Sequence, residues 1–134
     1  MASIHREISI GVAPEAAWDA MRDAGALHTR LVRGFVTDCK REEGARLVTF
    51  ANGFVARELI VDVDDNRRRI AWAAVGGRLT HHNASTQVLA EGERQCRVVW
   101  TADVLPHALA PAITVMVEHG LQAMRQTLEA DAAG

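Results

Sequence analysis

Six strand-length segments follow one another through the middle of the chain, and no helical segment separates them. Each is rich in Val, Ile, Thr, Phe or Trp, the residues that favour β-strands. Turn-forming residues such as Asn52-Gly53 and Gly76-Gly77 lie between them. The segments are 34–43, 45–53, 54–63, 68–75, 78–90 and 95–104. Because parallel strands need long crossover connections, these short links predict an antiparallel meander.

The flanking segments complete the architecture. Residues 6–12 alternate Ile8 and Ile10 with polar side chains, which predicts a seventh strand. Pro14 suits the first turn of a short helix that ends before Gly25, and residues 25–32 predict a second short helix. A long helix is expected from Pro106 to about Glu129. Its apolar or small positions share one face, at 113, 116, 117, 120, 121, 124 and 128.

This order of elements predicts an α+β helix-grip fold. In that fold a seven-stranded curved antiparallel sheet wraps around a long C-terminal helix, with two short helices after strand 1. A length of 134 residues, 49% of them hydrophobic, suits a single domain spanning residues 1–134. The fold usually leaves a cavity between sheet and helix, and the alternative is a sheet and helix packed solid.

Several functional classes are disfavoured by composition. The formal net charge is −2 and the chain has no extended basic patch, so we expect no nucleic-acid partner. No apolar run approaches the roughly 20 residues of a membrane span. No secretion signal is visible, and Cys39 and Cys96 form no CxxC pair. They therefore predict reduced thiols in a cytoplasmic protein, without a cysteine-based zinc site.

Strand alternation predicts which side chains face the helix. Adjacent strand residues point to opposite faces, so His81 and His82 cannot readily bind one metal together. We expect His81 to face solvent and His82 to face inward. No other histidine spacing suits a metal, and we expect neither a metal nor a cofactor. The same alternation places Trp100 inside. Both faces of the strand around Trp72 are apolar, so alternation alone does not decide there, and pairing with the neighbouring strands favours Trp72 inside.

Glu58 has the same strand parity as Phe54, which is expected to face inward. The same alternation therefore predicts that the Glu58 carboxylate also faces inward. A buried carboxylate is costly unless it is paired, and Arg33 is a candidate partner because its parity set includes Phe35. The alternative is a surface Glu58 paired with Arg57 or Arg69.

At two stretches the sequence resembles a known superfamily. "ISIGVAPEAAWDAMRD", and "RVVWTADVLP" followed by the long helix, resemble START-like ligand-binding domains. These form the SRPBCC superfamily of polyketide cyclases, dehydrases and lipid-transport proteins. The resemblance covers nearly the whole chain. It implies the helix-grip fold and a cavity for a small hydrophobic or lipid-like ligand, in a bacterial-style member.

The middle of the chain locally resembles the plant abscisic acid receptors, through "ARELIVDVDDN", "AAVGGRL" and "HHNAS". That resemblance implies that Arg33 takes the place of the lysine that pairs with the ligand's carboxylate. It also implies pocket positions for Glu58, Trp72, His82 and Ala84. The latch histidine and the gate pattern of those receptors are missing, and Gly120 replaces a polar pocket residue. We therefore expect a related pocket without abscisic acid binding.

Three functions remain open from the sequence. The first is binding or carriage of a small hydrophobic molecule, with or without a carboxylate or polar head. The second is a cofactor-independent cyclase, aromatase or dehydratase that uses His82 and Glu58 in the same cavity. The third is an interaction module, since small side chains on the long helix would permit a homodimer. No catalytic residue is assigned. The predicted ligand-binding residues are Arg33, Phe35, Phe54, Glu58, Trp72, His82, Ala84, Trp100, Ile113, Met116, Val117 and Gly120.

Two glycine turns suggest a further hypothesis. Asn52-Gly53 and Gly76-Gly77 would flank one mouth of the cavity, where flexible turns can act as gates.

Overall fold

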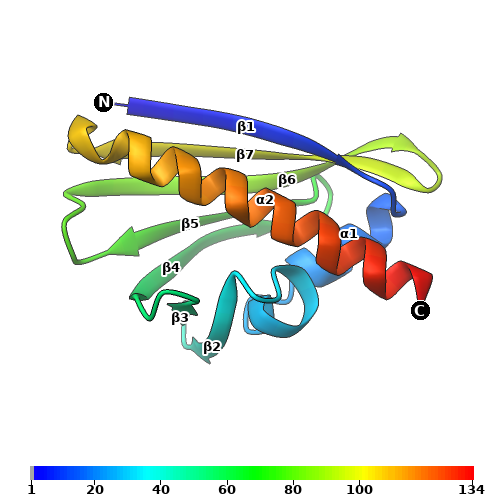
Figure 1. Ribbon diagram of the computed structural model, residues 1–134, viewed down its shortest axis with the longest axis horizontal. Coiled ribbons are helices and arrows are strands. Elements are labelled where there is room, and N and C mark those ends of the chain that lie inside the picture. Colours follow the sequence, from blue (N-terminus) through cyan, green and yellow to red (C-terminus); the bar gives the residue numbers. More distant parts are fainter. Residues whose placement is uncertain (1) are drawn as a thin grey trace.

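A seven-stranded antiparallel sheet curves around one long helix in the computed structural model, which describes residues 2–134 (Figure 1). The strand order is β1-β7-β6-β5-β4-β3-β2, so the chain forms a meander from β2 to β7 and β1 adds to its last strand. The strands are β1 (Ala2–Ile10), β2 (Val36–Glu42), β3 (Ala45–Phe50), β4 (Val55–Asp64), β5 (Arg69–Val75), β6 (His81–Gly92) and β7 (Gln95–Leu105). The helix-grip fold that the element order predicts is confirmed.

The helices also follow the prediction, with shifted ends. The two short helices after β1 are α1 (Pro14–Met21) and a π-helix, η1 (Leu27–Leu31). The long helix α2 (Ala110–Ala133) begins later than expected, after a short 3-10 turn, η2 (His107–Leu109). Pro111 explains this start, because proline fits the first turn of an α-helix, where its missing N–H is not needed.

The strand predicted over 78–90 begins only at His81. Gly76 and Gly77 both have left-handed backbones, with φ of 89° and 68°. Two such residues in succession turn the chain away from β5, so the next residues form a loop. Arg78, predicted in the strand, lies in this loop. The backbone N–H of Thr80 then donates to the carbonyl of Leu105 at 2.9 Å, which brings the chain back to the sheet.

The long helix covers only part of the inner face of the sheet. Its main contacts are with β1, β7 and η1 (Figure 1). An α-helix with its side chains is about 10–12 Å across. Strands lie about 4.8 Å apart, so one helix spans only two or three of them. The inner faces of β3, β4 and β5 are therefore left without a covering helix.

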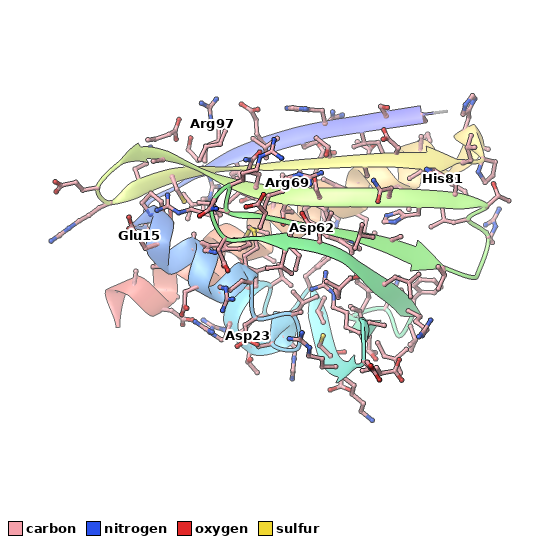
Figure 2. The ribbon with its side chains drawn as sticks, turned by 180° about the vertical axis from the view of Figure 1, so that it is seen from behind. Glu15, Asp23, Asp62, Arg69, His81 and Arg97 are labelled. Atoms are coloured by element: carbon pink, nitrogen blue, oxygen red, sulfur yellow. The ribbon has the colours of Figure 1, made fainter. Side chains whose placement is uncertain are left out.

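Strand alternation in β7 places the core as predicted. Its inward side chains are no more than 9% exposed, and they are Cys96, Val98, Trp100, Ala102 and Val104. Figure 2 shows the opposite face of the sheet, where Asp62, Arg69, His81 and Arg97 lie. This face carries exposed or half-buried charged side chains, together with a few exposed apolar ones such as Val75 and Leu89. The sheet thus has one apolar face and one solvated face, as an antiparallel sheet with a one-sided core should.

Gly120 sets how closely α2 approaches the sheet. A Cβ atom added at Gly120 would lie 2.7 Å from Cζ3 of Trp100 and 3.3 Å from Cε2 of Phe35. The Trp100 ring is itself held edge-to-face against Trp72, with ring centroids 5.7 Å apart. Only a glycine therefore lets the helix rest on this pair of tryptophans.

We expect Gly120→Ala to destabilise the protein by about 1 kcal/mol or more. Alanine favours a helix by about 1 kcal/mol over glycine, but forcing a methyl group into a packed core costs about 1–3 kcal/mol. Urea denaturation measures the change, and Gly120→Ala/Trp100→Phe should recover part of the loss because the smaller ring makes room. A Gly120→Ala protein more stable than wild type would contradict this close contact.

Candidate functional site

A cavity of about 230 Å³ lies between α2 and the uncovered half of the sheet. Aromatic side chains form much of its wall, and they are Phe35, Phe50, Phe54, Trp72 and Trp100. Ile113, Met116 and Val117 contribute from α2. Ligand pockets usually hold roughly 300–1,000 Å³ and are mostly apolar with a few placed polar groups. This cavity has that chemistry, and its volume lies slightly below that size range.

The structure brings most of the predicted site residues to this cavity. Those that line it are Phe35, Phe54, Glu58, Trp72, His82, Trp100, Ile113, Met116 and Val117. Phe54 is 56% exposed, so it lies at the rim, where the cavity reaches the surface. Ala84 and Gly120 are buried but do not line the cavity. Ala84 lies in the core, opposite Trp72 on β5 and Ala102 on β7. The space beside Gly120 is occupied by the ring of Trp100, as described above.

Arg33 does not face the cavity, and its expected pairing with Glu58 is wrong. Its guanidinium forms two hydrogen bonds to the Asp131 carboxylate, both 2.9 Å long, near the end of α2. The side chain is 42% exposed. Strand parity does not apply at Arg33, because Gly34 has a left-handed φ of 85° and β2 begins only at Val36. Arg33 therefore lies before the strand, where alternation gives no information.

The true partner of Glu58 is Arg46, a residue that the sequence reasoning missed. Nε of Arg46 donates to Oε1 of Glu58 at 2.8 Å, and the two side chains are only 3% and 10% exposed. The residues lie directly opposite each other on β3 and β4. The Arg46 guanidinium carbon also lies 5.3 Å from the ring centroid of Trp72, a cation–π arrangement. The sequence carried a signal, since Arg46 has the same strand parity as the inward residues Val48 and Phe50.

This ion pair places a polar group in the mostly apolar wall of the cavity. Burial raises the pKa of the Glu58 carboxyl, although the charge and hydrogen bond of Arg46 act in the opposite direction. Within residues 2–134, Oε2 of Glu58 has no hydrogen-bond partner. Glu58 also lines the cavity, so this oxygen can accept a hydrogen bond from a bound molecule.

The His82 side chain bridges β5 and β6 where their backbone hydrogen bonds end. The ladder between β5 and β6 ends at the pair Trp72 and Ala84. Beyond it, the backbone N–H of Ala74 donates to Nδ1 of His82 at 2.9 Å, so the imidazole takes the place of a strand carbonyl. Burial lowers the pKa of His82, and the neighbouring charge of His81 lowers it further. A neutral imidazole that accepts at Nδ1 carries its proton on Nε2, which makes His82 a donor in the cavity wall.

Thr86 adds a weakly engaged hydroxyl to the wall. Its Oγ1 donates to Sδ of Met21 at 3.2 Å, and both residues line the cavity. A thioether sulfur is a weak acceptor. A ligand carbonyl or ether oxygen could therefore compete for this proton at little cost.

Neither a metal-binding cluster nor a membrane-spanning helix is found in the part of the chain that the structure describes. No group of three or more His, Cys, Asp or Glu side chains in residues 2–134 could hold a metal ion. Over the same residues, no helix has the length and apolar character needed to cross a membrane.

Removing one member of the buried ion pair should be strongly destabilising. Arg46→Met leaves the Glu58 carboxylate without its partner, and such changes cost about 3–5 kcal/mol. Arg46→Met/Glu58→Met should recover much of the loss, because no charge is then left unpaired. Urea denaturation at pH 7 checks both variants. A loss below about 1 kcal/mol in Arg46→Met would show that the pair is solvated.

Acidification should weaken the protein through His82. Its folded-state pKa lies below the unfolded value of about 6.5. The unfolded chain therefore binds the proton more readily, and stability falls as the pH drops below about 6.5 toward the folded pKa. Protonation of Nδ1 also removes the acceptor for the Ala74 N–H. Melting temperatures at pH 7.5 and pH 5.5 measure the loss.

The neighbouring histidine provides the matched control. His82→Gln should lose less stability on acidification than wild type. Exposed His81→Gln should keep most of the wild-type sensitivity, because burial is the main cause of the lowered His82 pKa and the His81 charge is the smaller one. Equal acid sensitivity in all three proteins would contradict the assigned role of His82.

Solved structures share this fold at low sequence identity. XoxI from Bacillus cereus superposes with a TM-score of 0.86 and 18% identity, covering 98% of this chain and 99% of that chain. The di-domain ARO/CYC BexL from the BE-7585A biosynthetic pathway gives 0.82 and 14%, covering 96% of this chain and 47% of that one. Norcoclaurine synthase from Thalictrum flavum, solved with dopamine and hydroxybenzaldehyde, gives 0.72 and 18%, covering 98% and 86%.

The sequence comparisons agree with the fold. No curated protein sequence matches the chain significantly. A family model described as "Polyketide cyclase / dehydrase and lipid transport" matches residues 1–132, nearly the whole chain. The START-like resemblance read from the sequence is thereby confirmed, and the chain belongs to the polyketide cyclase, dehydrase and lipid-transport family.

Proposed function

We propose that the protein binds or carries a small, largely apolar molecule in the cavity between the sheet and α2. The observation that carries the proposal is the cavity itself, whose apolar and aromatic wall contains one buried ion pair. Moving apolar surface from water into such a cavity is favourable by about 25 cal/mol per Å². The family description, which names lipid transport beside cyclase and dehydrase activity, is consistent with this function.

The polar groups of the wall would orient the ligand. Oε2 of Glu58 offers an acceptor, Nε2 of neutral His82 offers a donor, and the Thr86 hydroxyl can donate in place of its bond to Met21. Few polar groups in an apolar cavity give specificity, because a mismatched ligand leaves one of them buried without a partner.

Cyclase-type or dehydratase-type turnover in the same cavity is the second candidate. One observation favours it, namely the raised pKa of Glu58 in an apolar wall, which suits a general acid or base. No hydrogen bond joins His82 to Glu58 within residues 2–134, where His82 Nδ1 accepts from Ala74 and Glu58 Oε1 accepts from Arg46, so a His82–Glu58 dyad is not formed in this structure. Once a ligand is identified by native mass spectrometry, its fate on incubation with wild type separates the two functions. A carrier returns it unchanged, whereas an enzyme converts it and loses this turnover in a Glu58→Gln variant that circular dichroism shows to be folded.

Two expectations from the sequence stay predictions. Cys39 and Cys96 are both free and buried, in keeping with the reduced, cytoplasmic protein expected from the sequence. The second expectation is a homodimer formed through the small side chains of α2, and size-exclusion chromatography with light scattering would test it.

Filling part of the cavity should weaken the binding of an apolar probe. N-phenyl-1-naphthylamine is neutral and fluoresces strongly in apolar surroundings. Ala74 lines the cavity, and its neighbour Ala73 lies on the other face of β5. We expect Ala74→Leu to weaken probe binding at least tenfold and the matched control Ala73→Leu to leave it unchanged.

A fluorescence titration measures the two dissociation constants. The proposal fails if wild type does not bind the probe, or if Ala74→Leu binds it as well as Ala73→Leu does. Circular dichroism and thermal melting of both variants show whether they remain folded.

A further inference from the structure

The charges around the cavity do not cancel. Among the described residues that line it, the charged ones are Arg46, Glu58 and Arg78. Arg46 and Glu58 compensate each other through their 2.8 Å ion pair. His82, the remaining titratable group in the wall, is held neutral by burial. The guanidinium of Arg78 therefore leaves the cavity with one net positive charge.

Arg78 lies at the mouth of the cavity. It is exposed and belongs to the loop that joins β5 to β6, at one end of the sheet (Figure 1). Gly76 and Leu79, from the same loop, also line the cavity. A Cβ atom at Gly77 would lie 3.9 Å from Cζ of Phe54, so this loop meets the rim formed by the turn between β3 and β4.

No carboxylate of residues 2–134 lies within ion-pair distance of Arg78. Several other surface arginines do have a carboxylate partner, and these include Arg22, Arg30, Arg33, Arg57 and Arg97. Other arginines without an ion pair within residues 2–134, such as Arg94, do not line the cavity. Arg78 thus combines a place in the cavity wall with a guanidinium that is open to an external anion. Its planar set of donors matches a carboxylate or sulfonate well.

We propose that Arg78 holds the anionic head of an amphiphilic ligand whose apolar body fills the cavity. This assigns the ligand class of the proposed binding function and rests on it. Burying an anion deep in an apolar cavity is costly. At the mouth, the head stays partly hydrated while Arg78 contributes charge-assisted hydrogen bonds. The anion-binding role that the sequence predicted for Arg33 thereby belongs to Arg78, because Arg33 is engaged with Asp131 outside the cavity.

Two fluorescent probes with one shared skeleton test the proposal. 1-Anilinonaphthalene-8-sulfonate carries a sulfonate, and N-phenyl-1-naphthylamine is the same ring system without it. We expect wild type to bind the sulfonate probe about tenfold more tightly than the neutral probe at low salt, in line with the strength of hydrogen bonds to charged groups. The preference should shrink as ionic strength rises, because the mouth is exposed to solvent.

Arg78→Gln should lower the affinity for the sulfonate probe alone and so remove this preference. Arg78→Lys should keep part of the preference. Arg94→Gln is the matched control. Arg94 is also exposed and has no ion pair within the described chain, but it lies in the turn between β6 and β7 at the other end of the sheet. The Arg94→Gln protein should bind both probes with wild-type affinity.

The outcomes separate the two proposals. Equal affinity of wild type for both probes, or equal loss in Arg78→Gln and Arg94→Gln, would overturn the role of Arg78 while leaving the cavity as a binding site. Sulfonate binding that survives in Ala74→Leu would place that probe outside the cavity and would also overturn it. Failure of wild type to bind either probe would overturn the binding function itself.

Discussion

A single helix cannot cover a seven-stranded sheet, and the rest of this structure depends on that mismatch. α2 packs on β1 and β7, where Gly120 lets it rest against the Trp100 ring. The inner faces of the strands farther from β1 curve toward the helix without touching it along their length. The space that remains is the cavity. The helix that completes the core on one side therefore creates the candidate site on the other.

The polar groups of the cavity follow from its position in the sheet. Arg46 and Glu58 face each other on neighbouring strands, so the sheet register pairs two charges that neither strand could bury alone. Trp72 supports the guanidinium with its ring face. His82 stands where β5 and β6 separate, and its imidazole replaces a backbone acceptor. The cavity wall is thus mostly apolar, with its polar atoms placed by strand pairing.

Much of the fold was predictable because strand alternation and turn residues are local signals. The inward positions of Trp100 and His82 came from parity within single strands, and that of Trp72 came from its expected pairing with neighbouring strands. Parity misled at Arg33, since the left-handed Gly34 ends the alternation before β2 starts. Arg46 was missed because its partner is set by the register between two strands, which no single segment shows. The contact of Gly120 with Trp100 likewise depends on the docking of the helix and could not be read from the chain.

The most direct test of the account is a two-dimensional NMR titration that follows the indole N–H signals of the three tryptophans. Trp72 and Trp100 line the cavity, whereas Trp18 lies outside it with its indole N–H donating to Asp65 at 2.9 Å. Added N-phenyl-1-naphthylamine should shift the signals of Trp72 and Trp100 together, with one affinity, and leave that of Trp18 in place. Shifts confined to Trp18, or no shift at saturating probe, would contradict a ligand cavity between the sheet and α2.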